Sequence, residues 1–228
     1  MDLVRASHLY KVFGKNERQV IERLKAGESR EELASLGTAA VIDVSFEVAK
    51  GETFVVMGLS GSGKSTLIRM INGLWSPSEG TVEVAGKVVS GMNDAQMRAL
   101  RRDHVSMVFQ HFALLPHLTV RENAAYGLKL QGKLKQKERL EKANEWLNTV
   151  GLNGWGDKYP HQLSGGMQQR VGLARALAAE TDILLMDEAF SALDPLIRRE
   201  MQDQLLELQG ALNKTIIFIT HDLNEAMY

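Results

Sequence analysis

The 228-residue sequence has no cysteine, almost no net charge and no long apolar run. Without cysteine, disulfide bonds and thiolate metal sites are excluded. The formal net charge of −1 gives no basic signature for a polyanion, so nucleic acid is not indicated. The longest apolar stretches are short pieces such as residues 216–219, well below the roughly 20 residues that span a bilayer. Residues 1–10 lack the apolar core of a signal peptide, so we expect a soluble protein that acts at a membrane only through a partner.

The composition is that of an ordinary globular protein. Hydrophobic residues make up 44% of the chain and charged residues 24%, which is enough to bury a real core. The length fits one large domain or two small ones. Metal-ligand spacing is missing from five of the six histidines, namely His8, His104, His111, His117 and His161.

The stretch Gly58-Leu59-Ser60-Gly61-Ser62-Gly63-Lys64-Ser65-Thr66 matches the phosphate-loop pattern G-x-x-x-x-G-K-[ST]. It follows a strand-like apolar run at 53–57 and opens a helical run at 67–74, the context in which the pattern has this meaning. Its three glycines leave room for backbone N–H groups to turn inward around a polyphosphate. The helix that begins near Lys64 points its positive dipole end at the same anion. Lys64 adds a charge for the β- and γ-phosphates, and the Ser65 hydroxyl is placed to ligate Mg²⁺.

Strand-like and helical segments alternate along most of the chain, which indicates an α/β core with parallel strands buried on both faces. Strands are predicted at residues 3–9, 41–48, 53–57, 81–84, 87–89, 105–109, 183–186 and 215–219. Helices are predicted at residues 17–26, 64–74, 94–102, 119–150 with a break near 132, 164–179 and 195–212. The pair 81–84 and 87–89 resembles a hairpin, and the helix-dense middle at about 94–160 indicates an inserted helical subdomain.

A second helical insertion is predicted near the N-terminus, at about 15–38. Its first helix places Val20, Ile21 and Leu24 on one face. Ser29 is suited to cap a second small helix, which would end at Gly37.

Polar residues follow three of the predicted strands, at the sheet edge where ligands bind in open α/β folds. Asp187 ends an apolar strand and can hold Mg²⁺ directly or through water. Glu188 follows it, in position to orient or deprotonate a water that attacks the γ-phosphate. Gln110 and His221 each end another strand, where an amide can reach a metal or a water and an imidazole can bond a γ-phosphate oxygen. Each of these residues alone is also typical of a polar strand end facing solvent.

A second glycine-bearing helix start lies at Ser164-Gly165-Gly166-Met167. Ser164 would cap the helix, and the two glycines expose the N–H groups of its first turn, which makes a second anion site. One polyphosphate does not need two helix starts from a single chain. We therefore expect this one to serve a nucleotide held by another copy of the chain, although a glycine-rich cap alone would be unremarkable.

Taken together, these motifs resemble the ATP-binding subunit of ABC transporters over almost the whole chain and in family order. On this resemblance the Walker A loop is residues 58–66, the Q-loop glutamine is Gln110 and the signature is residues 163–167. Walker B is residues 183–187, and Glu188 after it is the catalytic carboxylate. The D-loop is Ser191-Ala192-Leu193-Asp194, and the switch histidine is His221. Phe13 lies where the family places an aromatic that stacks on adenine, with Tyr10 as the nearby alternative. The signature ends in Met167, where many members have glutamine.

The resemblance implies an α/β, P-loop NTPase (ABC-type ATPase) core with a mostly parallel sheet, an antiparallel β subdomain and an inserted α-helical subdomain, in one domain over 1–228. It implies catalytic roles for Glu188, His221, Lys64 and Gln110, Mg²⁺ ligation by Ser65, Gln110 and Asp187, and dimer communication by Ser191 and Asp194. ATP and Mg²⁺ are the implied substrate and cofactor. Two copies would sandwich two ATP molecules head to tail, each completing the other's site with residues 164–167.

The insertion at 15–38, the run 107–114 and the run 187–198 are similar to the glycine betaine/proline/choline uptake ATPases. That resemblance implies a motor for import of a compatible solute, peripheral to the cytoplasmic face of the membrane. It implies two partners, an integral membrane permease and a solute-binding protein. Residues 112–119 would form the groove that receives a coupling helix of the permease. The family continues beyond the point that corresponds to Tyr228, often with paired CBS domains, so we expect that part to be absent here.

The motifs are also compatible with other functions. The chain could serve an importer of amino acids or other small polar solutes. A DNA-repair ATPase of the same superfamily would need long heptad repeats, which are missing, and a translation factor would need two cassettes. A nucleotide switch without turnover is disfavoured by Glu188 and His221.

Overall fold

The computed structural model describes residues 2–110, 112–191 and 193–222. The chain forms two compact units, Met1–Lys50 with Val56–Met97 and Gly51–Val55 with Arg98–Tyr228, and each is described by itself. Among the residues singled out in the sequence, His111 and Ala192 lie outside the described residues.

The first unit is built on an antiparallel sheet in the order β2-β1-β4-β5, with β1 at Asp2–Phe13, β2 at Thr38–Ala49, β4 at Glu79–Val84 and β5 at Lys87–Val88. The predicted hairpin is confirmed as β4 and β5. Its two turn residues, Ala85 and Gly86, both have positive φ, which suits the right-handed twist of the flanking strands. The sheet also confirms the predicted antiparallel part of the fold.

The insertion between β1 and β2 has a small core of its own. Helix α1 (Glu17–Lys25) buries Val20 and Ile21 against Leu33 and the strand residue Val12. The prediction of a second helix after Ser29 is wrong, because residues 30–36 form turns. Ser29 and Glu32 do form the reciprocal bonds of a helix cap, but the backbone bonds that follow alternate between i+3 and i+4 partners, so no regular helical ladder develops.

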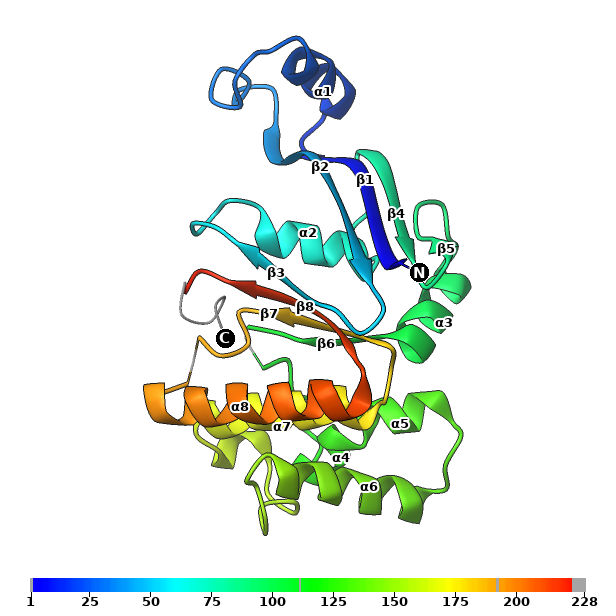
Figure 1. The fold of residues 1–228 in the computed structure, drawn as a ribbon, viewed down its shortest axis with the longest axis vertical. Coiled ribbons are helices and arrows are strands. Elements are labelled where there is room, and N and C mark those ends of the chain that lie inside the picture. Colours follow the sequence, from blue (N-terminus) through cyan, green and yellow to red (C-terminus); the bar gives the residue numbers. More distant parts are fainter. Residues whose placement is uncertain (1, 111, 192, 223–228) are drawn as a thin grey trace. The chain divides into compact units, whose positions relative to one another are not determined.

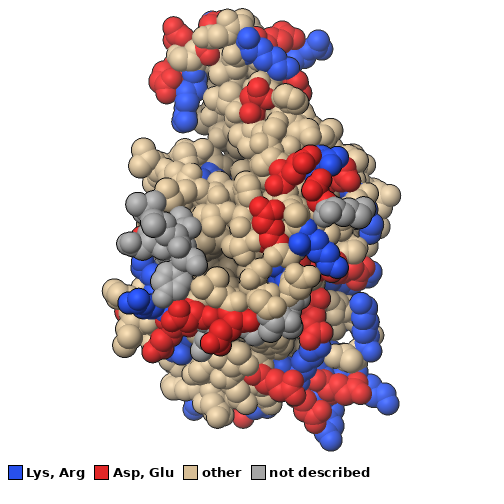
Figure 2. Space-filling model, viewed as in Figure 1, with Lys and Arg blue, Asp and Glu red and all other residues tan. Residues whose placement is uncertain are grey.

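Acidic and basic side chains lie next to each other on this insertion (Figure 2). Ion pairs join Arg18 to Glu22 and Arg23 to Glu28. The surface of the insertion is therefore mixed in charge and carries no single-sign field.

Helix α2 (Lys64–Ile71) contacts β2 and β4 in the first unit. It packs through a stripe of buried side chains, Leu67, Ile68, Met70 and Ile71. The stripe has the spacing of one helix face, which is why an apolar run here forms a helix and not a strand. The loop before α2 is thereby fixed to a packed element.

The second unit contains most of the other sheet, which has the order β3-β8-β7-β6; residues 56–57 of β3 are assigned to the first unit. The strands of this sheet are β3 (Thr53–Met57), β6 (Val105–Val108), β7 (Ile183–Asp187) and β8 (Thr215–Thr220). The pairs β6–β7 and β7–β8 are parallel, with Val108 opposite Met186 and Asp187 opposite Ile219. Every residue of β7 and β8 is buried, as expected for strands covered on both faces.

Helices α7 (Gly165–Ala178) and α8 (Pro195–Leu212) run along one side of this sheet (Figure 1). Three further helices, α4 (Val120–Ala124), α5 (Tyr126–Gln131) and α6 (Gln136–Thr149), contact α7 and form the helix-dense part of the chain. The remaining helices are α3 (Asp94–His104) and the short η1 (Pro160–Gln162). Within the part of the chain that the structure describes, no helix has the length and apolar character needed to cross a membrane.

The nucleotide-site residues in the two units

The phosphate loop of the first unit takes the shape that its glycines allow. Gly61 and Gly63 have φ of 77° and 93°, in the left-handed region that side chains disfavour. A Cβ on Gly63 would stand 2.0 Å from the Ala40 carbonyl oxygen, so no other residue fits there. Gly63 is the N-cap of α2 and has no side chain to accept from the first-turn N–H groups, which stay available to an anion.

Lys64 lies inside this loop. Its side chain is largely buried, and its ammonium donates to the carbonyls of Gly58 and Leu59, both at 2.8 Å. An ammonium has three donors, so the loop fixes the charge and leaves a donor for a phosphate oxygen. Ser65 follows in the first turn of α2, where a hydroxyl is suited to Mg²⁺.

Two aromatic rings meet near the end of β1. Phe13 is 38% exposed and contacts Trp75 edge to face, with the ring centroids 5.0 Å apart. Lys11 lies 5.2 Å from the centroid of Phe13, and Arg69 lies 4.9 Å from that of Trp75. The alternative base-stacking residue, Tyr10, is 5% exposed within the core of the insertion, so of these two aromatic residues Phe13 is the exposed one. Trp75 is not among the residues predicted from the sequence, where its one signal is a large aromatic directly before the turn that starts at Ser76.

Three predicted residues meet at one edge of the sheet in the second unit. Gln110 donates from Nε2 to Glu188 Oε2 at 3.1 Å, and His221 Nδ1 lies 3.2 Å from the same oxygen. They converge because they follow β6, β7 and β8, whose parallel register brings the three strand ends together. Asp187 is 2% exposed at the end of β7.

The backbone at Glu188 is unusual. Its φ is 47°, a conformation that costs a non-glycine residue roughly 1–3 kcal/mol. Its N–H donates to the Ile219 carbonyl at 3.1 Å, which holds the residue to the end of β8. Among the described residues no three His, Asp or Glu side chains form a cluster that could hold a metal by themselves. A Mg²⁺ ion at this edge would therefore need further oxygen ligands, such as phosphate oxygens and water.

The second helix start confirms the predicted cap. Ser164 Oγ accepts from the N–H of Met167 at 3.3 Å, and Ser164 and Gly165 are exposed. A Cβ on Gly165 would stand 3.5 Å from the Phe112 ring, and one on Gly166 3.3 Å from Leu193. The side chain of Met167 packs against the core, so only its backbone is directed to the helix start.

The D-loop residues have local roles in the described structure. Ser191 Oγ donates to the Glu188 carbonyl at 2.8 Å, and Asp194 caps α8 by accepting from the Ile197 N–H at 3.1 Å. Both contacts are those of an ordinary turn and helix start. Dimer communication by Ser191 and Asp194 therefore stays a prediction.

The site residues thus fall into two groups, one in each unit. The first unit carries the phosphate loop and Phe13, and the second carries the Glu188 cluster, the signature helix start and the D-loop. Within the second unit, the strand-end residues that the sequence predicted to lie together do so.

Comparison with known proteins agrees with the motifs. The family described as "ABC transporter" matches residues 41–191. The glycine betaine transport ATP-binding protein OpuAA of Bacillus subtilis (strain 168) is 55% identical over 226 residues, 98% of this chain and 54% of that protein. The glycine betaine/proline betaine transport system ATP-binding protein ProV of Escherichia coli (strain K12) is 52% identical over 225 residues, 96% of this chain and 55% of that protein.

A solved structure extends the likeness to the whole fold. The dimeric, post-hydrolysis state of the ATP-binding cassette MJ0796 with ADP and Pi superposes with a TM-score of 0.85 at 33% identity, covering 98% of this chain and 90% of that one. It confirms the predicted P-loop ABC-type fold. The chain spans about half the length of the relatives OpuAA and ProV. From the family match, the relatives and the fold together, the chain belongs to the ABC transporter family.

Proposed function

We propose that this chain is the ATP-hydrolysing motor of an importer for glycine betaine, proline or a related compatible solute. The relatives that match over nearly the full chain are named for glycine betaine transport in two bacteria. Since the chain spans about half of those proteins, the transport activity, solute and partners are inferred from the likeness. The described domain would be one ATPase domain, with its insertion at 15–38 and its helical subdomain at 94–160.

The observation that carries this proposal is the convergence of Gln110 and His221 on one oxygen of Glu188. The Gln110 amide donates to Oε2 and the His221 imidazole lies against the same oxygen, so both orient the carboxylate, and Oε1 would accept the proton of an attacking water. After the proton moves, the His221 imidazole can bond a γ-phosphate oxygen where charge develops. A switch that only binds nucleotide has no need of a carboxylate held in this way.

ATP would be held by the phosphate loop, with Lys64 on the β- and γ-phosphates and Phe13 against the adenine. Mg²⁺, with its preference for hard oxygen ligands, would take Ser65, Gln110 and Asp187 directly or through water, and would neutralise phosphate charge. The donor set fits this ion because all three residues offer oxygen.

A second copy of the chain would complete each site. Ser164, Gly165, Gly166 and Met167 present a capped helix start with exposed N–H groups, which suits a γ-phosphate presented from another molecule. The MJ0796 cassette is described as a dimer, with ADP and Pi bound in one of its structures. Ser191 and Asp194, next to Glu188 and the start of α8, would report on the facing site.

A membrane permease would dock on the helical part of the second unit. Residues 112–119 lead into α4, beside a surface groove of about 200 Å³ lined by apolar and charged side chains, Leu118, Glu122, Tyr126, Lys129, Arg139 and Leu140. A mixed groove of this kind suits one amphipathic helix of a partner. The chain would thus lie at the cytoplasmic face of the membrane, with a solute-binding protein acting through the permease and no nucleic acid as ligand.

The test is phosphate release from ATP by the wild-type chain and by Glu188→Gln, which keeps the size of the side chain and an oxygen to which Gln110 can donate but lacks the base. We expect the variant to bind ATP with unchanged affinity and to lose turnover by roughly the 10²–10⁴-fold that a general base contributes. Equal phosphate release from the two proteins would refute the hydrolase assignment. For the transport assignment, copurification from detergent should recover a membrane permease; recovery of nucleic acid alone would contradict it.

A further inference from the structure

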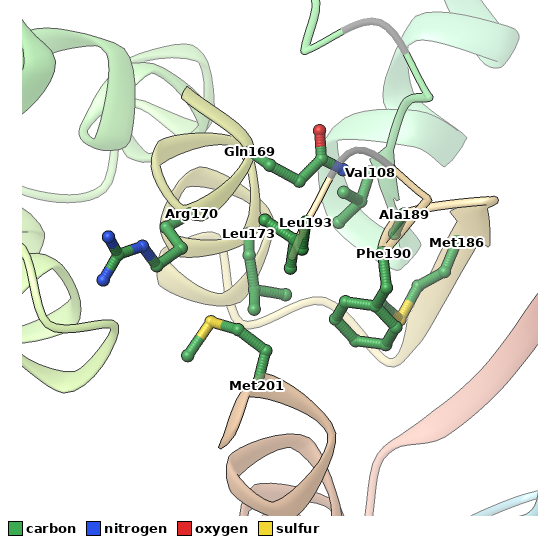
Figure 3. Close-up of a pocket in the computed structure, with 9 residues that line it drawn as sticks. All are labelled: Val108, Gln169, Arg170, Leu173, Met186, Ala189, Phe190, Leu193 and Met201. Atoms are coloured by element: carbon green, nitrogen blue, oxygen red, sulfur yellow. The ribbon is translucent and has the colours of Figure 1, made fainter. Parts of the chain in front are cut away.

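Helix α7 is tied to the segment that carries Gln110. Gln169, in the second turn of α7, donates from Nε2 to the carbonyl of Phe109 at 3.3 Å. Phe109 directly precedes Gln110, whose own amide reaches Glu188. Figure 3 shows Gln169 extending from α7 toward Val108, the last residue of β6. A single side chain therefore links the signature helix to the backbone on which Gln110 stands.

A second tie lies on the other side of Gln110. Arg175, further along α7, donates to the carbonyls of Ala113 at 2.7 Å and Phe112 at 3.2 Å. Burial lowers the pKa of this guanidinium, and an arginine stays charged nonetheless. A buried charge needs such partners, so the two carbonyls are bound firmly.

The tied backbone is strained. Phe112 and Ala113 both have φ of 47°, which residues with a Cβ seldom adopt and which persists only where surrounding contacts fix it. The Arg175 fork supplies those contacts. The ring of Phe112 also lies against Gly165 at the start of α7. Without α7, this segment would have little reason to keep its shape.

Stability alone does not explain Gln169. It is 3% exposed, and its Oε1 has no hydrogen-bond partner among the described residues. The cavity beside it has a volume of about 10 Å³ and is lined mainly by apolar side chains, among them Leu173, Met186 and Phe190 (Figure 3). A buried amide whose oxygen lacks a hydrogen-bond partner destabilises the fold. We therefore infer that Gln169 serves through its donor contact to the Phe109 carbonyl and not through a gain in stability.

We propose that Gln169 and Arg175 are positioning residues that clamp the Gln110 segment, residues 109–110 and 112–113, to α7. The distance between the Gln110 amide and the Glu188 carboxylate then depends on the position of α7. Because α7 begins at Ser164 and Gly165, an anion bound at that helix start acts on the general base within the same chain. The clamp itself rests on geometry alone, whereas its expected effect on the rate of hydrolysis rests on the proposed ATPase function.

The clamp is tested directly by hydrogen exchange on Gln169→Met, which keeps the side-chain length and removes the amide. We expect backbone amides in peptides covering 105–115 to exchange several-fold faster than in the wild type, because the segment loses an anchor. Gln168→Met is the matched control: Gln168 is the neighbouring glutamine of α7 and donates to Leu163 of its own helix start, not to the Gln110 segment. Unchanged exchange in Gln169→Met, or an equal increase in the control, would overturn the clamp.

Arg175→Lys provides a second variant should Gln169→Met fold poorly, which its melting temperature reports. A lysine ammonium lacks the planar guanidinium that donates to two carbonyls at once. The rate of amide hydrogen exchange at residues 112–115 should therefore rise while the melting temperature changes little. Protection equal to the wild type in this variant would contradict the proposal.

A double-mutant cycle tests the action through Gln110. Gln169→Met should lower kcat about tenfold with KM for ATP unchanged, whereas in a Gln110→Ala background it should have no further effect. Additive losses would mean that Gln169 acts on stability only, and would overturn the positioning role. If the wild-type chain releases no phosphate, the proposed function fails, and the exchange experiment still decides the clamp.

Discussion

The two glycine-bearing helix starts of this chain differ in how their N–H groups are satisfied. At α2 the N-cap is Gly63, left-handed and without any side-chain acceptor, and Lys64 is held in the loop by two carbonyls. At α7 the N-cap is Ser164, extended, and its hydroxyl already accepts from Met167. The first start is incomplete without an anion and carries its own charge. The second has one first-turn N–H group, that of Met167, satisfied by its own cap and offers the others as an exposed site, which fits a role in completing a site that begins on another chain.

The largest expected effect comes from removing the charge of the first start. Lys64→Ala should weaken ATP binding about 10- to 100-fold, since a hydrogen bond to a charged group contributes about 1.5–3 kcal/mol, and turnover should be lost. Titration with a fluorescent ATP analogue measures the affinity. Lys137→Ala, at an exposed lysine of α6, is the control and should bind normally. Normal affinity in Lys64→Ala would remove the contrast between the two starts.

The second prediction tests whether the two helix starts serve sites on different chains. Ser164→Arg should leave ATP binding by the single chain nearly intact and abolish turnover, because the bulky cation blocks a site offered to a second copy. Phosphate release and analogue binding measure the two properties.

Mixing provides the decisive version of this experiment. Lys64→Ala and Ser164→Arg are each inactive alone, yet a mixed dimer contains one site with both residues intact. Part of the phosphate release should therefore return on mixing. Inactivity of the mixture, or full activity of Ser164→Arg alone, would speak against a site shared between chains.

The smallest expected effect concerns stability at the first start. Gly63→Ala meets both a positive φ and a carbonyl at 2.0 Å, whereas Gly61→Ala meets a positive φ of 77° and no atom within 4 Å. Strain alone costs about 1–3 kcal/mol, so Gly61→Ala should be destabilised by that amount and Gly63→Ala by more. Urea unfolding monitored by circular dichroism gives both values. Equal losses would mean that the Ala40 carbonyl yields without cost.

The sequence predicted most of the elements because their signals are local. The apolar run before Asp187, the cap at Ser164 and the proline that opens α8 each specify an element from neighbouring residues alone. The meeting of Gln110, Glu188 and His221 was also predictable, since parallel strands end at one edge.

What sequence reasoning missed depends on contacts between distant residues. The pattern after Ser29 satisfies a helix template and even forms the cap with Glu32, yet the backbone bonds that follow are irregular and the chain forms turns. Tyr10 and Phe13 look alike in sequence, and only packing of the insertion decides which ring is buried. The contact of Trp75 with Phe13 joins positions 62 residues apart in numbering, and that of Gln169 with Phe109 joins positions 60 apart, so no local pattern encodes them.

The register of the first sheet makes the N-terminal insertion a convenient place for protein engineering. Phe13 and Thr38, which flank the insertion, are direct partners in the β1–β2 ladder. The 24 residues between them leave and re-enter the sheet at adjacent points, so their length adds little to the entropy of closing that hairpin. A short turn could replace them, or a reporter peptide could extend them, without changing how the two strands pair. Such chimeras would show which properties of the ATPase belong to the sheet and which belong to the insertion.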